Sequence, residues 1–117
     1  MIPVNAPIIT AESKSLVARA LKEGWISSAG PYIEQFEQEF AKYLGVKHAI
    51  LVNTGTAALH IALLSTGIGE GDEVIVPSFT MASSWMAVMY TGAKPIFVDV
   101  DPVIYTIDPT LIESAIT

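Results

Sequence analysis

Apolar residues recur at helical spacing in two stretches near the N-terminus. The first stretch follows Thr10, a favourable N-cap residue, and stops before Gly24, which suits a helix C-terminus. The second begins at Pro31, which suits a first helical turn, and stops at Gly45. The apolar positions are Leu16, Val17, Ala20 and Leu21 in the first stretch, and Ile33, Phe36, Phe40 and Tyr43 in the second. The pattern predicts two amphipathic helices.

Polarity and proline content suggest that two other N-terminal features lie at the surface. The acidic residues of the second helix, Glu34, Glu37 and Glu39, are interpreted as its solvated face. Residues 2–9 contain two prolines among alternating apolar residues. Because proline cannot donate to a sheet ladder, we expect this segment to be an extended arm lying on a surface, not a strand.

From residue 47 the pattern changes to short apolar runs that alternate with helical stretches. The runs predict strands at 48–53, 73–77 and 95–99, and the stretches predict helices at 56–66 and 82–90. A further helix is expected from Asp108 and Pro109 to Ala115. Strands that alternate with helices through short connections predict an α/β fold with a mostly parallel sheet and flanking helices.

The length and composition bound the domain organisation. The chain has 117 residues, of which 51% are hydrophobic and 15% charged, enough for one core. Three parallel strands would leave apolar edges open, and helix 56–66 is apolar nearly all round. We therefore expect a single incomplete domain of a larger α/β enzyme, with an arm and two helices at 1–46 and the start of the large domain at 47–117. A subunit interface is the expected cover for helix 56–66.

Charge and residue usage argue against several classes of partner. The formal net charge is −6 and the few Lys and Arg residues are scattered, so no basic stripe could follow a nucleic acid or an anionic membrane. There is no cysteine, which removes disulfides and thiolate chemistry. No run reaches the roughly 18 apolar residues of a membrane span, and no leader pattern opens the chain. The expected location is the cytoplasm.

The strongest candidate site is the turn at residues 53–57, where the first predicted strand passes into a helix. The first amides of a helix have no intrahelical partner and lie at the positive end of its dipole, so they attract phosphate. Gly55 allows close backbone approach, and Thr54 and Thr56 offer hydroxyl donors. The alternative interpretation is an ordinary strand-to-helix turn with a threonine cap. A non-catalytic α/β module, phosphate-binding or purely structural, is the corresponding alternative function.

A second candidate is the pair Asp99 and Asp101, at the end of the third predicted strand. Two carboxylates two residues apart at a strand end are similar to the nucleophile motif of haloacid-dehalogenase-type phosphatases, which hold magnesium. That motif normally follows the first strand of its domain. The structural interpretation is that both carboxylates cap a turn before Pro102. The glycines of residues 67–72 precede a strand, so we interpret them as a turn and not as a nucleotide-binding loop.

Four motifs, taken in order, resemble the DegT/StrS-type sugar aminotransferases. They are GWISSAGPYI at 24–33, with Phe36 and Glu37 after it, NTGTAALH at 53–60, GDEVIVP at 71–77 and GAKPIFVDVD at 92–101. Within that family they are most similar to the GDP-perosamine synthase group. The resemblance extends over essentially the whole chain.

The resemblance implies a pyridoxal 5'-phosphate (PLP) enzyme of the aspartate aminotransferase fold, known as fold type I. It implies transfer of an amino group from glutamate to a nucleotide-linked keto-sugar by a homodimer, with Gly55, Thr56 and Ala57 holding the cofactor phosphate. The family's Schiff-base lysine and the carboxylate that pairs with the pyridinium nitrogen come after the last residue of this chain. We therefore expect no catalytic residue here, and no activity from this stretch alone.

One position departs from the family pattern. Where the family has an aromatic residue stacked on the cofactor ring, this chain has Met81, whose thioether can pack against a ring. Trp85 lies one helical turn further on and could replace the aromatic residue, although a core role is the more ordinary interpretation. Trp25 and Ser27 are expected to form a wall on the substrate side, the alternative for Trp25 being a packing anchor.

Overall fold

A computed structural model describes residues 2, 3 and 5–117. The chain divides into two compact units, Met1–Leu51 and Val52–Thr117, which are considered separately. The first unit contains α1 (Ala11–Lys22) and α2 (Pro31–Leu44). The second contains α3 (Gly55–Ser65), β1 (Glu73–Pro77), α4 (Ala82–Tyr90) and β2 (Lys94–Val98), followed by two short 3₁₀ segments, η1 (Pro109–Leu111) and η2 (Glu113–Ala115).

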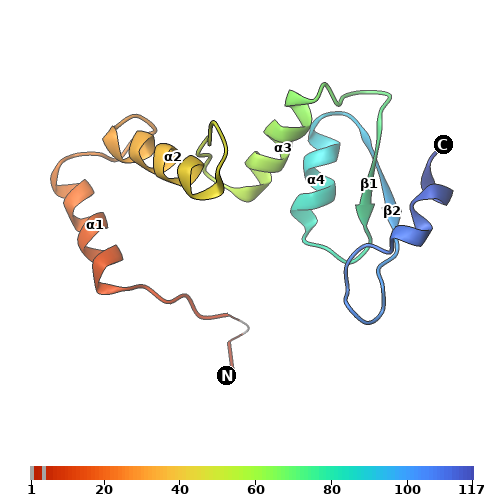
Figure 1. The fold of residues 1–117 in the computed structure, drawn as a ribbon, viewed down its shortest axis with the longest axis horizontal. Coiled ribbons are helices and arrows are strands. Elements are labelled where there is room, and N and C mark those ends of the chain that lie inside the picture. The colour runs from red at the N-terminus through yellow and green to blue at the C-terminus, as the bar shows by residue number, and fades with distance from the viewer. Residues whose placement is uncertain (1, 4) are drawn as a thin grey trace. The chain divides into compact units, whose positions relative to one another are not determined.

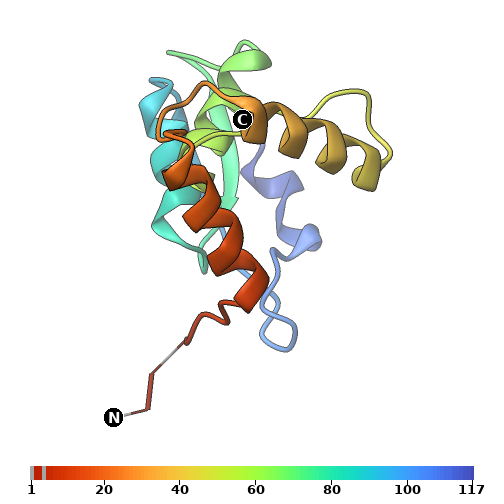
Figure 2. The ribbon, with the colours of Figure 1, turned by 90° about the vertical axis from the view of Figure 1, so that its left-hand side faces the viewer.

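The two predicted N-terminal helices are confirmed (Figures 1 and 2). The Thr10 hydroxyl caps α1 by accepting a hydrogen bond from the amide of Ser13 at 3.1 Å. Helix α2 ends at Gly45, which adopts a left-handed conformation with φ +68° and lets the chain turn away from the helix. Both boundaries depend on residues within one turn of the helix end, which explains why the sequence located them.

The acidic face of α2 and the N-terminal arm differ in part from expectation. Glu37 was predicted to be solvated, but its Oε1 accepts a hydrogen bond from the amide of Leu51 at 2.8 Å. The described residues of the arm, 2, 3 and 5–9, form neither helix nor strand, as predicted, whereas position 4 lies outside the described residues. Ile2 and Ile8 are 95% and 94% exposed, so the expected packing of the arm on a surface is not seen in this unit.

The second unit is built on two parallel strands joined by α4 (Figure 1). The register runs from Glu73 opposite Lys94 to Pro77 opposite Val98. On one face of the sheet, Val76 packs in a core cluster with Val88 of α4, which is only 1% exposed, and with Ala93. Ile75 points the other way and borders a pocket with residues of the C-terminal segment. This alternation places α4 on one face of the sheet and residues 109–117 on the other.

The predicted strand at 48–53 was wrong, since these residues form no strand in the structure. Among the described residues no segment pairs with them, and Ile50 and Leu51 are 78% and 43% exposed. An apolar, β-branched run is only a strand when a neighbouring strand accepts and donates its hydrogen bonds. The sheet therefore has two strands here and not the predicted three.

The predicted C-terminal helix forms as two 3₁₀ turns and not as an α-helix. Its predicted start is confirmed, because the Asp108 carboxylate accepts a hydrogen bond from the amide of Thr110 at 2.9 Å. The segment ends on the sheet, where the Thr117 hydroxyl donates to Glu73 Oε2 at 2.7 Å. Anchoring at both ends over such a short span favours the tighter 3₁₀ turns.

Helix α3 carries apolar side chains on nearly all of its faces, as predicted. Leu63 packs against the core, whereas Leu59, Ile61 and Leu64 are 44%, 48% and 51% exposed. The second unit therefore presents an apolar surface along α3. In the part of the chain that the structure describes, no helix is long and apolar enough to cross a membrane.

Candidate functional site

The turn before α3 is a threonine-capped helix start. Thr54 is extended, with φ −150° and ψ 155°, and its Oγ1 accepts a hydrogen bond from the amide of Ala57 at 3.1 Å. The Thr54 carbonyl accepts the first helical hydrogen bond, from Ala58 at 3.1 Å. The predicted threonine cap is thus confirmed. Two of the first four amides of the helix, those of Ala57 and Ala58, have partners within the chain.

The amides of Gly55 and Thr56 are different. Among the described residues no hydrogen bond occupies either of them. A Cβ placed on Gly55 would meet nothing within 4 Å, so the backbone at this point faces open space. Two unpaired N–H groups at the positive end of a helix, at a glycine with open space where a side chain would lie, suit an oxyanion such as phosphate.

The loop that follows β1 lies toward the same end of the second unit. Figure 1 shows α3 and α4 both running against the strand direction, so both helices begin toward the carboxyl ends of β1 and β2. Met81 occupies the N-cap position of α4 and is 78% exposed. The Thr80 and Ser84 hydroxyls are 2.8 Å apart and fasten the start of the helix. Gly55, Thr56 and Ala57 open α3, and Met81 precedes α4, so these residues belong to the starts of the two helices.

The carboxylates of Asp99 and Asp101 are both engaged within the chain, as the structural interpretation predicted. Asp99 Oδ1 accepts hydrogen bonds from the Val100 amide at 2.8 Å and the Ser78 hydroxyl at 2.9 Å, which lower the pKa of its carboxyl. Asp101 Oδ1 accepts from the amides of Ile104 and Val103 at 3.0 and 2.7 Å, with the same effect on its pKa. In the described part of the chain no three metal-ligating side chains cluster. These contacts favour a turn and give no support to a phosphatase site.

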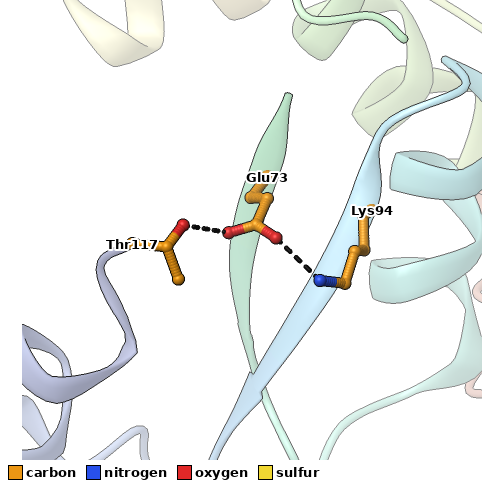
Figure 3. Close-up of polar contacts among 3 residues, drawn as sticks. All are labelled: Glu73, Lys94 and Thr117. Carbon is orange, nitrogen blue, oxygen red and sulfur yellow. Dashed lines mark hydrogen bonds and ion pairs between the residues drawn. The ribbon is translucent and has the colours of Figure 1, made fainter. Parts of the chain in front are cut away.

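Lys94 lies at the opposite end of the strands from the Gly55 turn. Its Nζ is 2.8 Å from Glu73 Oε1, and Figure 3 shows Lys94 and Thr117 on either side of the Glu73 carboxylate. Lys94 is the only lysine of residues 52–117. This ion pair lies at the amino ends of the strands and keeps Lys94 away from the helix termini that would hold a phosphate.

Trp85 has the core role that the sequence analysis favoured. Its side chain is partly buried and packs against the cluster of Val76, Val88 and Ala93. Trp85 is therefore part of the contact between α4 and the sheet. Met81 remains the candidate for packing on a cofactor ring.

Trp25 and Ser27 belong to the other unit, in the loop between α1 and α2. The Trp25 side chain is 45% exposed and lies against Gly30. The Ser27 hydroxyl donates to the carbonyl of Ala29 at 3.2 Å and accepts from the amide of the same residue at 3.3 Å. Both side chains thus shape this loop, and a substrate-side role for them stays a prediction.

Ser78 was not singled out from the sequence as a site residue, although it forms a specific contact with Asp99. A signal was present, because Ser78 directly follows one predicted strand and Asp99 ends the next. Parallel pairing aligns Pro77 with Val98, so the two following residues are placed side by side. The register, which the sequence does not specify, was needed to find the pair.

Comparisons with known proteins agree with the resemblance described above. The pattern of the DegT/DnrJ/EryC1/StrS aminotransferase family matches residues 7–117. GDP-perosamine synthase of Caulobacter vibrioides is 48% identical over 116 residues, which are 99% of this chain and 31% of that protein. The solved structure of DesV from S. venezuelae matches with a TM-score of 0.80 and 48% identity over 92% of this chain and 29% of that chain.

The solved structures also bear on the fold and the cofactor. NtdA from Bacillus subtilis, solved with bound cofactor PMP, matches with a TM-score of 0.84 and 38% identity over 93% of this chain and 26% of that one. PMP is the aminated form of PLP, the predicted cofactor. The predicted fold class, the start of a fold-type I aminotransferase, is confirmed by these matches. The chain spans less than a third of the length of these relatives.

Proposed function

We propose that this chain, which belongs to the DegT/DnrJ/EryC1/StrS aminotransferase family, forms the start of a PLP-dependent sugar aminotransferase. The proposed reaction moves an amino group from glutamate to a nucleotide-linked keto-sugar. The observation that carries the proposal is the pair of unpartnered amides at Gly55 and Thr56, at a helix N-terminus where a Cβ on Gly55 would meet nothing within 4 Å. Residues 47–117 would then begin the PLP-binding large domain.

The proposed cofactor contacts use the free amides of Gly55 and Thr56 and the exposed side chain of Met81. The amides of Gly55 and Thr56 would donate to the cofactor phosphate, with Ala57 completing the turn around it. The exposed thioether of Met81 would pack on one face of the cofactor ring and exclude water from it. Trp25 and Ser27 would contribute to the substrate side, which is the least direct of these assignments because both side chains already make contacts within their loop.

The proposed reaction is a balanced exchange. Glutamate becomes 2-oxoglutarate as its amino group is replaced by a carbonyl oxygen, and the keto group of the sugar becomes an amine. PLP, when bound, supplies the electron sink that makes this exchange feasible. The reaction also needs a lysine at the cofactor, and Lys94, the one lysine of its unit, is ion-paired at the far end of the strands. The residues described here would therefore bind and orient PLP without supplying that lysine. We accordingly propose that this stretch alone is inactive.

The proposal is tested by removing one amide while keeping the helix. Gly55→Pro deletes the N–H at the first position of α3, where proline is favourable, and the extended conformation of Thr54 accepts a following proline. Ala11→Pro is the matched control, because Ala11 opens α1 after Thr10, whose extended conformation also accepts a following proline. PLP titration of the complete gene product, followed by visible absorbance, measures the dissociation constant.

We expect Gly55→Pro to weaken PLP binding by about tenfold or more, the loss of one hydrogen bond to a charged group. Ala11→Pro should leave the affinity unchanged. Unaltered affinity in Gly55→Pro would reject the assignment of the phosphate to this turn. A wild-type gene product that binds no PLP, or forms no 2-oxoglutarate from glutamate with any nucleotide-linked keto-sugar, would reject the function.

The proposal includes a cytoplasmic homodimer that contacts neither nucleic acid nor membrane. The exposed residues Ile61 and Leu64 are three positions apart on α3 and form an apolar face suited to a subunit contact. Sedimentation of the gene product should give a dimer, and Ile61→Glu with Leu64→Glu should give a monomer. A wild-type monomer at micromolar concentration would exclude the dimer.

A further inference from the structure

We propose that Asp99 is a positioning residue, which holds the loop of residues 78–81 and thereby the side chain of Met81 in place for the cofactor ring. The inference rests on the proposed function. It assigns a task to a carboxylate that the sequence suggested only as a turn cap or a phosphatase nucleophile. The task is carried out through Ser78, and Asp99 itself touches no ligand.

The loop is anchored to β2 at its first residue. The Ser78 amide donates to the Val98 carbonyl at 2.8 Å, and the Ser78 hydroxyl donates to Asp99 Oδ1 at 2.9 Å. The same oxygen accepts the amide of Val100 at 2.8 Å, so the carboxylate is oriented by its own backbone. The contact therefore extends the pairing of β1 and β2 by one residue beyond Pro77 and Val98.

The loop is anchored to α4 at its other end. The Thr80 and Ser84 hydroxyls are 2.8 Å apart, whereas Met81 at the N-cap position makes no side-chain capping bond. In between, the Phe79 ring lies 5.9 Å from the ring of Tyr105. Only two residues separate Ser78 from Met81, so a shift at the Asp99 contact is passed to Met81 with little room for compensation.

Cofactor binding should therefore depend on the hydrogen bond between Ser78 and Asp99, although neither residue touches the cofactor. Met81 is 78% exposed, so little packing fixes its side chain. Its position is set by the backbone, and the backbone is set at the strand end by Ser78 and Asp99. Loss of that bond should let the loop fluctuate and lower the fraction of molecules whose Met81 is placed for binding.

The experiment compares Asp99→Ala, Asp99→Asn and Ser78→Ala in the complete gene product, with PLP as the probe. We expect Asp99→Ala and Ser78→Ala each to raise the PLP dissociation constant about tenfold and to reduce the visible circular dichroism of the bound cofactor. The double variant should bind no more weakly than Asp99→Ala alone, because both substitutions break the same hydrogen bond between Ser78 and Asp99. Asp99→Asn should restore most of the affinity, since its amide oxygen can still accept from Ser78 and Val100.

Asp72→Ala is the matched control for a general loss of stability. Asp72 Oδ2 also accepts a turn amide, that of Gly69 at 2.8 Å, but it lies before β1 at the other end of the strands. Its removal should lower the thermal unfolding midpoint and leave PLP affinity unchanged. Ser78→Ala removes a single hydroxyl and provides the test if Asp99→Ala does not fold.

The possible failures are distinguishable. If the wild-type protein binds PLP and both Ser78→Ala and Asp99→Ala bind it equally well, the positioning role is wrong and the proposed function stands. If Asp72→Ala weakens PLP binding as much as Asp99→Ala does, the effect is one of stability and the positioning role is again wrong. If the wild-type protein binds no PLP, the proposed function fails and this inference fails with it.

Discussion

The indole ring of Trp25 lies directly over Gly30, so that a Cβ at Gly30 would come within 2.8 Å of Trp25 Cε3. Gly30 also has a φ of +148°, which side-chain-bearing residues rarely adopt. The loop between α1 and α2 therefore depends on glycine at this position for two reasons, a close contact and a backbone conformation. This relationship accounts for the packing role of Trp25 in its loop.

Substitution of Gly30 should consequently destabilise the protein. Gly30→Ala should reduce the free energy of unfolding by about 1–3 kcal/mol, through overpacking and backbone strain together. Adding Trp25→Ala to this variant should not restore full stability, because the strain remains. The control is Gly69→Ala, whose Cβ would meet only the Thr91 carbonyl at 3.8 Å and which should change stability little. Urea denaturation measures all three.

The core of the second unit should respond strongly to truncation at Val88. This side chain is 1% exposed between α4 and the sheet. Val88→Ala removes two buried carbon atoms and leaves a cavity, so we expect a loss of about 2 kcal/mol. Val103→Ala makes the same chemical change at a side chain that is 80% exposed, and should cost less than about 0.5 kcal/mol. Equal losses would show that this packing is not formed in solution.

The hydrogen bond between Glu37 and Leu51 should be visible in amide exchange. Glu37 Oε1 accepts the Leu51 amide at 2.8 Å, although this segment forms no strand. Glu37→Ala should therefore accelerate exchange of the Leu51 amide to the rate of its unprotected neighbours. Glu37→Gln should preserve part of the protection, because its side-chain oxygen can accept the same bond. Protection that survives Glu37→Ala would have to come from a strand partner.

The pair Glu73 and Lys94 should make stability dependent on pH at the acidic end of the range. Hydrogen bonds first from Lys94 and then from Thr117 keep the pKa of the Glu73 carboxyl below its ordinary value of 4.5. A carboxyl whose pKa is lower in the folded state stabilises the fold at pH values above its pKa in the unfolded state. That contribution is lost as the pH falls through its pKa in the folded state.

The stability difference between wild type and Glu73→Gln should thus be largest near neutral pH and should shrink below pH 4.5. Because Glu73 and Lys94 are accessible to solvent, added salt should also reduce it. Denaturation at several pH values provides the measurement, with Glu113→Gln as a control at a carboxylate that forms no ion pair in the described part of the chain. A difference independent of pH would contradict the predicted coupling.

The sequence specified those features of the fold that depend on neighbouring residues. The helices capped by Thr10 and ended by Gly45 lie where they were predicted, because a cap and a left-handed glycine act within one turn. The Thr54 cap at the candidate phosphate site and the turn closed by Asp101 are local in the same sense.

Tertiary structure decided what depends on partners distant in the sequence. The run at 48–53 has the composition of a strand, but without a paired neighbour it forms none. The contact between Ser78 and Asp99 required the register of β1 and β2, which composition does not specify. The sequence by itself thus determined the capped helix ends and the helix start that suits a phosphate. Only the fold determined which strands form and which side chains meet, because hydrogen bonds between segments form only when both partners are placed.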